Sequence, residues 1–454
     1  MKINWLLAAL LLCPPEAFAF CGFYVAKADS SLYNKASQVV LVRNGDKTVL
    51  TMANDYRGDP KEFALVVPVP VVLHKSDVKV VAPALLAGLD AYSSPRLVEY
   101  YDEDPCSPPR MYKGRFSAVA AVRGSAVGGG GHGLSAKALG VTIEEKFTTG
   151  EYDILILSAK ESDGLQTWLT QEGYKLPKGA SRALQPYIKL KLKFFVAKVN
   201  LKEQSKSGFA KLRPLQFAFT DARFMLPLRL GMLNADGPQD LIVYAITKEG
   251  RVESTNYRTV DMPSDREIPT YARGDFARVY PAMFDVAWKK QDRRSVLTEY
   301  SWDSNWCDPC ASEPPGREAL EKLGVFWFPD TPDGAPSQPG FMPGRRGQYG
   351  GPLQARITRL HVRYEPENWP EDLVFQETTD RRNFQARYVL RHRWEGTPTC
   401  QAAKDYLSKA LPERESKAVD DLALLTGWEP ETIRSEWKKA RAEGKDNSPK
   451  HELE

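Results

Sequence analysis

Histidine and cysteine are scarce in this sequence, and their scarcity limits the chemistry that the chain can support. The 454 residues include five histidines and six cysteines. No two histidines lie within one helical turn of each other, no His-Glu-x-x-His occurs, and no second Cys-x-x-Cys completes a zinc-binding set. The sequence therefore predicts no metal site and no cofactor.

Motifs for nucleophilic and phosphate chemistry are missing as well. No Gly-x-Ser-x-Gly elbow is present. The glycines at 128–131 are followed by no Gly-Lys-Ser/Thr, so they predict a flexible loop rather than a phosphate cradle. The sequence does not decide whether a catalytic pair of carboxylates for glycoside hydrolysis is present, because the distance between two such groups is set by the three-dimensional fold.

The chain also has little net charge and no long apolar run beyond its N-terminus. Its 62 basic and 58 acidic side chains leave a net charge of +4, too small to favour nucleic acid as a partner. No later stretch approaches the roughly 18–20 apolar residues of a membrane helix. Since 42% of the residues are hydrophobic and 26% charged, we expect a globular protein whose mature form lacks a transmembrane anchor.

The N-terminus has the pattern of a secretory signal peptide over residues 1–19. Lys2 supplies a positive start, residues 3–13 form an apolar core, and a small-x-small cleavage motif ends at Ala19. The apolar run is too short to span a bilayer. We therefore expect cleavage after Ala19 and export to the periplasm or the extracellular space.

Five cysteines remain in the predicted mature chain, and an oxidising compartment makes disulfides the expected state. They are Cys21, Cys106, Cys307, Cys310 and Cys400. Five cysteines form at most two bridges and leave one thiol, and the sequence alone does not choose among the arrangements.

Strand patterns dominate the first half of the chain. Residues 39–43 and 47–52 flank Asn44-Gly45, a strong signal for a type I′ hairpin. Further hairpins are predicted around Thr149-Gly150 and, with Gly250 in the turn, between residues 241–247 and Arg251. Other strands are predicted at 63–67, 188–199, 217–220, 353–364, 373–377 and 386–394. Pro68 and Pro70 favour an edge position for the first of these.

Helical patterns are shorter and fewer, and they gather at the C-terminus. Helices are predicted from Pro83, from Asp163, at 317–323 and over the last 50 residues or so. Strands and helices do not alternate regularly, so we predict an α+β fold of mostly antiparallel sheet, with short helices and a helical C-terminal segment.

Composition divides the chain into five predicted segments. A Pro/Gly-rich stretch at 329–352 is a loop or linker, with six prolines and six glycines in 24 residues. The segments are a signal peptide at 1–19, a main α+β domain at 20–328, this loop, a β-rich segment at 353–400 that packs on the main domain, and a helical extension with a polar tail at 401–454.

Several separated segments together resemble a known bacterial family, the domain of unknown function 2330. They are residues 56–60, 63–70, 173–180, 194–199, 256–260, 306–310, 358–364 and 375–377. The resemblance spans roughly residues 21–400. It implies an exported protein, and it implies neither a reaction nor catalytic residues.

The motif Trp306-Cys307-Asp308-Pro309-Cys310 is similar to the active site of thioredoxin-type proteins. That chemistry needs an exposed first thiolate at a helix N-terminus, which lowers the pKa of the thiol. Pro314 is disfavoured inside a helix, and the residue before a proline favours extended backbone. The next helix is therefore predicted to begin near Pro315, so its N-terminus does not lie at Cys307. We favour a structural disulfide between Cys307 and Cys310. Thiol–disulfide exchange is the main alternative, and metal binding or another cysteine pairing also stays open.

Arginine is the only basic residue other than histidine between residues 353 and 394, where it occurs eight times. Alternation places Arg387, Arg391 and Arg393 on one strand face, and Arg359, His361 and Arg363 on another. The planar guanidinium fork suits carboxylate or phosphate groups, such as those of acidic glycans or lipid headgroups. Pairing with the six acidic residues of the same span is the interpretation that we favour, and anion binding is the alternative.

These observations favour an exported, disulfide-braced binding or envelope-associated module that acts without catalysis. The alternative is a thiol–disulfide oxidoreductase that uses Cys307 and Cys310. The partners stay open, with an acidic glycan or another envelope component as one possibility through Arg387, Arg391 and Arg393.

Overall fold

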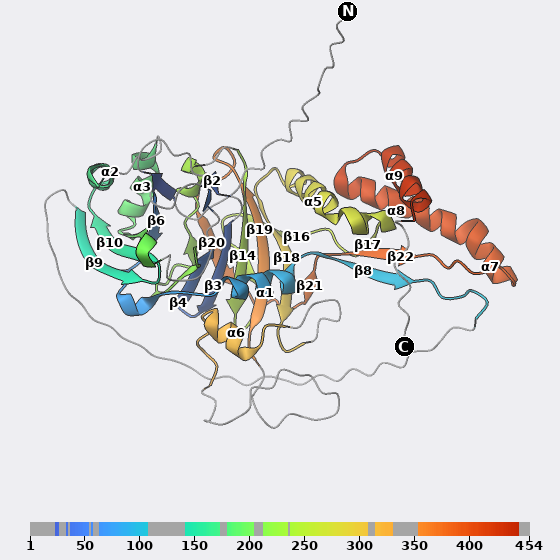
Figure 1. Cartoon of the computed structure of the whole chain (residues 1–454), viewed down its shortest axis with the longest axis horizontal. Helices are drawn as coiled ribbons and strands as arrows, with labels where there is room; N and C mark the ends of the chain where they lie inside the picture. The colour runs from blue at the N-terminus through green and yellow to red at the C-terminus, as the bar shows by residue number, and fades with distance from the viewer. Residues whose placement is uncertain are drawn as a thin grey trace, which may run out of the picture.

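The computed structural model describes most of the chain between Phe23 and Gly444 (Figure 1). The described residues are 23–26, 33–34, 37–53, 56–57, 63–107, 141–172, 179–203, 212–234, 237–306, 314–329 and 353–444. The predicted signal peptide, Cys21, Cys307, Cys310 and residues 330–352 lie outside them. Within the described part, mostly antiparallel sheets combine with separate helices, so the predicted α+β class is confirmed.

A nine-stranded mixed sheet forms the centre of the molecule (Figure 1). Its spatial order is β16 (Arg258–Asp261), β18 (Ser295–Asp303), β19 (Arg356–Tyr364), β14 (Gln239–Thr247), β3 (Ser37–Asn44), β4 (Lys47–Ala53), β12 (Leu215–Thr220) and β7 (Val78–Val80), with β21 (Phe384–Gln385) paired to β18. Two pairs in this sheet, β14 with β3 and β16 with β18, are parallel. The central strands β3 and β4 are buried along most of their length, because both faces of the sheet are covered.

The first two predicted hairpins are present. In the β3–β4 hairpin Asn44 pairs with Lys47, so the turn residues are Gly45 and Asp46 rather than Asn44 and Gly45. Of these two only Gly45 has a positive φ, +57°, so the turn is not the predicted type I′, which needs positive φ at both positions. The second hairpin joins β9 (Val141–Thr149) to β10 (Tyr152–Ala159) and also turns at a glycine with positive φ, Gly150.

A five-stranded antiparallel sheet packs against the first. Its order is β1 (Phe23–Ala26), β6 (Phe63–Val69), β11 (Lys193–Val199), β10 and β9. The edge position predicted for β6 is wrong, because β1 pairs with its residues 63–66. Pro68 lies beyond that pairing, at the end of β6 where only β11 adjoins it among the described strands, so its missing N–H is tolerated.

The third predicted hairpin is wrong. Both sides of β14 are taken by distant strands, β3 and β19. β15 (Val252–Ser254) pairs instead with β20 (Leu373–Glu377), and β13 (Met225–Leu226) completes that small sheet. Gly250 is needed there because a Cβ atom would come within 1.8 Å of the carbonyl oxygen of Thr378.

A parallel three-stranded sheet carries the C-terminal helices. It consists of β17 (Arg266–Glu267), β22 (Arg387–His392) and β8 (Arg96–Tyr101). A short pair, β2 (Tyr33–Asn34) with β5 (Tyr56–Arg57), stands apart from these sheets.

The helices cover the outer faces of the sheets. They are α1 (Pro83–Ser93), α2 (Ser162–Gln171), α3 (Ala180–Lys189), α5 (Phe276–Lys290), α6 (Arg317–Lys322), α7 (Gln401–Asp405), α8 (Leu411–Thr426) and α9 (Pro430–Ala442), with 3-10 turns at Lys75–Asp77, Gly231–Asn234 and Thr270–Asp275. A π-helical turn, Tyr406–Ala410, joins α7 to α8. None of the helices in the described part of the chain has the length and apolar composition of a membrane-spanning segment.

The strand predicted at 188–199 is wrong in its first half. Ile188 and Lys189 belong to α3, which closes where Lys191 takes a φ of +57° and its N–H bonds to the carbonyl of Ile188. β11 begins only at Lys193. A helix followed by a buried strand gives a nearly continuous apolar run, which the sequence pattern cannot divide.

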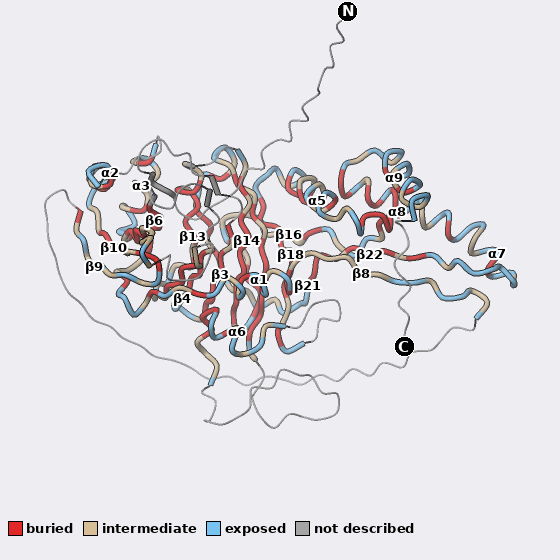
Figure 2. The backbone as a smooth tube through the Cα atoms, in the orientation of Figure 1, coloured by how far each residue is buried: buried red, intermediate tan, exposed pale blue. Residues whose placement is uncertain are grey.

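The main hydrophobic core lies between the two large sheets, where buried residues follow the strands (Figure 2). Leu41 and Leu50 face it from the nine-stranded sheet and Leu65 from the five-stranded sheet, and the rings of Phe195 and Phe217 stack between the sheets at 5.2 Å. A separate core joins β22 to α5, α8 and α9. The C-terminal helices are thus anchored by their own apolar cluster.

Candidate functional site

The three arginines predicted to bind an anion come from β22 and the residue after it. Tyr388, Leu390 and His392 are buried in this strand, so Arg387 and Arg391 lie on its other, more exposed face. Nε of Arg387 donates to the Asp265 carboxylate at 2.6 Å.

The structure separates these arginines into two groups. A cavity of about 390 Å³ lies between the ends of β8 and β22 and the helices α8 and α9. Arg391 and Arg393 line this cavity, and Arg387 does not. The cavity is the candidate functional site.

The inner part of the cavity is a tight ionic cluster. Arg414 lies 2.6 Å from Asp102 and 3.1 Å from Glu267. Nε of Arg391 donates to Glu267 at 3.3 Å, and the hydroxyl of Tyr406 donates to Asp102 at 2.6 Å. Asp102 thus joins β8 to the C-terminal helices, because the side chains of Arg414 and Tyr406 reach it.

Burial raises the pKa of the Glu267 carboxyl, and the positive charges of Arg414 and Arg391 oppose that effect only in part. The cluster therefore lies in a partly dehydrated environment, where a charge needs a partner. A ligand would have to break several short contacts to reach Arg391 or Arg414. These two arginines hold the cavity together.

The side chains with which α9 lines the cavity also have partners within the protein. Arg441 forms a two-point ion pair with Glu415 of α8, at 2.6 and 3.1 Å, and lies 4.2 Å from the centre of the Trp437 ring. Nε1 of Trp437 donates to the hydroxyl of Thr270 at 3.0 Å. This wall is fixed on α8 and on the turn that follows β17.

Arg393 stands in a different environment. Its guanidinium lies 3.7 Å from Glu395, beyond hydrogen-bond distance, and both side chains are 45% exposed. Trp394, between them in sequence, also lines the cavity. Its ring lies against Gly396, where a Cβ atom would fall 2.2 Å away, and its backbone N–H donates to the Tyr406 hydroxyl at 3.2 Å. Arg393 is thus the cavity arginine most open to an external anion.

Tyr101 adds an exposed aromatic surface next to these residues. Its ring stacks on the His392 imidazole with centroids 4.5 Å apart and is 55% exposed. Nε2 of His392 lies 2.8 Å from the Glu99 carboxylate, so this imidazole is buried and paired.

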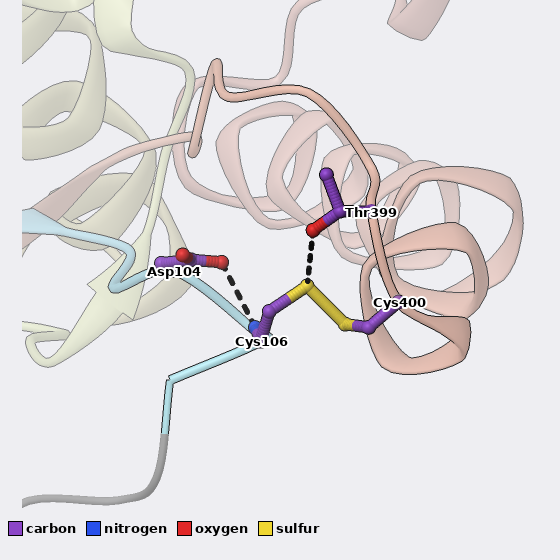
Figure 3. Close-up of a disulfide and its surroundings, with 4 residues drawn as sticks. All are labelled: Asp104, Cys106, Thr399 and Cys400. Carbon is purple, nitrogen blue, oxygen red and sulfur yellow. Dashed lines mark hydrogen bonds between the residues drawn. A yellow bond between two sulfur atoms is a disulfide. The ribbon is translucent and has the colours of Figure 1, made fainter.

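A disulfide ties the two chain segments that leave the cavity (Figure 3). Cys106, five residues after the end of β8, bonds to Cys400 at the start of α7, with their Cα atoms 5.8 Å apart. The Asp104 carboxylate accepts a hydrogen bond from the backbone N–H of Cys106 at 2.9 Å. The Thr399 hydroxyl lies beside the sulfur of Cys106. The sequence left this pairing open, and Cys21, Cys307 and Cys310 lie outside the described residues.

The second predicted arginine face is largely covered by the fold, with Arg359 buried and His361 and Arg363 partly buried. Glu299 of β18 contacts Nε of Arg359 at 2.5 Å and Nδ1 of His361 at 2.6 Å, and Arg363 forms a two-point pair with Asp240. Burial by itself disfavours a charged imidazole, but Glu299 and Asp240 outweigh it and raise the pKa of His361. This cluster is not part of the cavity lining and stabilises the sheet.

Sequence reasoning missed the half of the cavity that the helices provide. Arg414, Glu415 and Arg441 show no motif, and their carboxylate and arginine partners lie on other elements. The local signal was the helical pattern of the C-terminal segment, which predicted the helices and not their partners. Among the described residues, no group of three or more histidine, cysteine, aspartate or glutamate side chains is arranged to hold a metal.

Fold and site together define an α+β protein. Its charged cavity lies where the small parallel sheet meets the C-terminal helices. A family model described as an uncharacterized protein conserved in bacteria, the domain of unknown function 2330, matches residues 15–376. The match covers well over half of the chain, so the protein belongs to this family. Comparisons with curated proteins and with solved structures found no match.

The family match ends before β22 begins. The cavity therefore combines residues within the match, such as Asp102 and Glu267, with residues beyond it, such as Arg393 and Trp394.

Proposed function

We propose that this protein is an exported, non-catalytic binding module whose cavity takes an acidic sugar or another anionic component of the cell envelope. The observation that carries the proposal is Arg393, an exposed guanidinium whose carboxylate neighbour Glu395 lies 3.7 Å away, beyond hydrogen-bond distance, on a cavity lined by Trp394 and Tyr101. A guanidinium fork binds a carboxylate at two points, and aromatic faces pack against the apolar face of a sugar ring.

Export is supported by two independent features. The N-terminus has the charged start, apolar core and cleavage motif of a signal peptide. The Cys106–Cys400 disulfide fits an oxidising compartment, because thiols in the cytosol are kept reduced.

The test compares two sugars that differ by one lactyl group, which carries a carboxylate. N-acetylmuramic acid and N-acetylglucosamine are titrated into the mature protein by calorimetry. We expect the acid to bind more tightly and its affinity to fall with added salt. Arg393→Gln should remove this preference, because it removes the cation without removing the hydrogen-bonding side chain.

Arg387→Gln is the matched control for this experiment. Arg387 lies at the start of β22, outside the cavity and beside Asp265. We expect its variant to bind as the wild type does. Equal binding of the two sugars, or equal losses in the two variants, would refute the proposed site.

The alternative function is thiol–disulfide exchange by Cys307 and Cys310. Trp306 is 53% exposed and β18 leads into the motif, which favours access to a partner protein. The next described helix, α6, begins only at Arg317, too far along the chain to lower the pKa of a thiol at Cys307. Insulin reduction by the wild type that is lost in Cys307→Ser would establish the alternative, and we expect no turnover in either protein.

A further inference from the structure

The cavity is electrically balanced. Four arginines and four carboxylates line it, so a ligand with a single negative charge meets no net attraction over the cavity as a whole. Affinity for such a ligand must come from one local group, and a neighbouring carboxylate opposes it.

Three of the four arginines are held by short contacts to three of the carboxylates. Arg414 and Arg391 engage Asp102 and Glu267, and Arg441 engages Glu415 at two points. These groups are 12–36% exposed at their side chains, less than the remaining pair. They form the frame of the cavity.

The remaining pair is Arg393 and Glu395. Their charged groups are 3.7 Å apart and equally exposed, at 45%. An exposed ion pair of this kind contributes roughly 0–1 kcal/mol, so a ligand separates it at little cost. Once separated, the pair offers one cation and one anion two residues apart on the segment that follows β22.

From this arrangement we infer that the ligand carries a positive as well as a negative group on one small unit, as an amino sugar acid or an amino-acid-bearing glycan does. Its carboxylate binds Arg393, and its ammonium binds Glu395. This inference rests on the proposed function and deepens it, because Glu395 then makes the same cavity bind a plain anion less tightly than a ligand that also carries an ammonium group. Trp394 and Tyr101 supply the apolar contacts for the body of the ligand.

Four sugars of similar size test the inference. Muramic acid carries an amine and a carboxylate, N-acetylmuramic acid only the carboxylate, glucosamine only the amine, and N-acetylglucosamine neither. Each is titrated into the mature protein by calorimetry at neutral pH and low salt. We expect muramic acid to bind at least about tenfold more tightly than either singly charged sugar, as a second charge-assisted hydrogen bond implies.

Two variants assign the two charges. Glu395→Gln should bring muramic acid to the affinity of N-acetylmuramic acid and leave the latter no weaker. Arg393→Gln should bring muramic acid to the affinity of glucosamine. Arg387→Gln should change none of these values.

The failures of the two proposals are distinguishable. If both acids bind equally and Arg393→Gln weakens both, the anion site stands and the inference about the second charge is overturned. If glucosamine binds as tightly as muramic acid, or if neither acid binds better than N-acetylglucosamine, the anion site is overturned as well.

Discussion

At the scale of single residues, the arginines find their partners far away in the sequence. Arg359 contacts Glu299 and Asp90, Arg363 contacts Asp240, and Arg387 contacts Asp265. The sequence predicted which arginines share a strand face, because alternation is local. The favoured prediction that their acidic partners lie within residues 353–394 is wrong for these arginines. The tertiary fold brings together residues more than 50 positions apart, which a local pattern does not reveal.

The Glu299 carboxylate makes the free energy of unfolding depend on pH in the acid range. Burial alone would raise the pKa of its carboxyl, but the positive charges of His361 and Arg359 outweigh burial and lower the pKa from 4.5 to about 2. The charged form is favoured by folding, so its contribution is complete above about pH 4.5 and is lost as the pH falls through about 2. We expect Glu299→Gln to cost about 3–5 kcal/mol at neutral pH, because Arg359 loses a buried partner.

Urea denaturation between pH 2 and 7 measures this effect. The difference in unfolding free energy between the wild type and Glu299→Gln should shrink as the pH falls from 4.5 to 2. The exposed Glu318 of α6 offers a control, since Glu318→Gln should change stability little. A difference for Glu299→Gln that is constant over this range would show that the carboxylate is not held in its charged form by folding.

At the scale of elements, local signals predicted what local interactions decide. The two hairpins that turn at Gly45 and Gly150 were predicted because a glycine with positive φ marks the turn. β15 was assigned to the wrong partner because long-range pairing fixed its neighbour. α5 was not predicted at all, and Pro281 within it argues against a helix. Packing of its buried face, including Met283 and Trp288, outweighs that local cost.

The helices beside the cavity depend on the buried face of α8. Leu422 is fully buried against α5, α9 and β22, whereas Leu424 on the same helix is 54% exposed. We expect Leu422→Ala to lower the unfolding free energy by about 2–5 kcal/mol, through lost burial and the cavity left behind. Chemical denaturation measures the change.

Leu424→Ala is the matched control, with the same chemical change in the same helix. Its effect should stay within about 0.5 kcal/mol, because an exposed side chain loses little on truncation. Equal effects of the two substitutions would mean that α8 does not pack through the face described here.

At the scale of the whole molecule, sequence composition and three-dimensional contacts divide the chain differently. β19 lies between β18 and β14 in the nine-stranded sheet, so part of the segment 353–400 completes the central sheet. The division into segments 20–328, 329–352, 353–400 and 401–454 stays a proposal. The cavity was not predictable, because it arises where β8, β22 and the last two helices meet (Figure 1).

The Cys106–Cys400 disulfide is expected to brace this meeting point. It joins residues 294 positions apart, so it removes many conformations from the unfolded chain. We expect Cys400→Ser to lower the unfolding free energy by about 2–4 kcal/mol, and a reductant to lower the melting temperature of the wild type in the same way. Thermal unfolding followed by circular dichroism measures both effects.

Cys307→Ser provides the control for this prediction. It leaves the Cys106–Cys400 bond in place, so its melting temperature should still fall on reduction. The brace would be disproved if Cys400→Ser melted at the temperature of the oxidised wild type.

Mass spectrometry of the protein recovered from its own bacterium, with thiols blocked at lysis, tests the central claim most directly. An exported protein braced at its cavity should begin at Phe20 and yield a peptide in which Cys106 is linked to Cys400. Recovery of a chain that begins at Met1, with the thiols of Cys106 and Cys400 both free, would contradict the account.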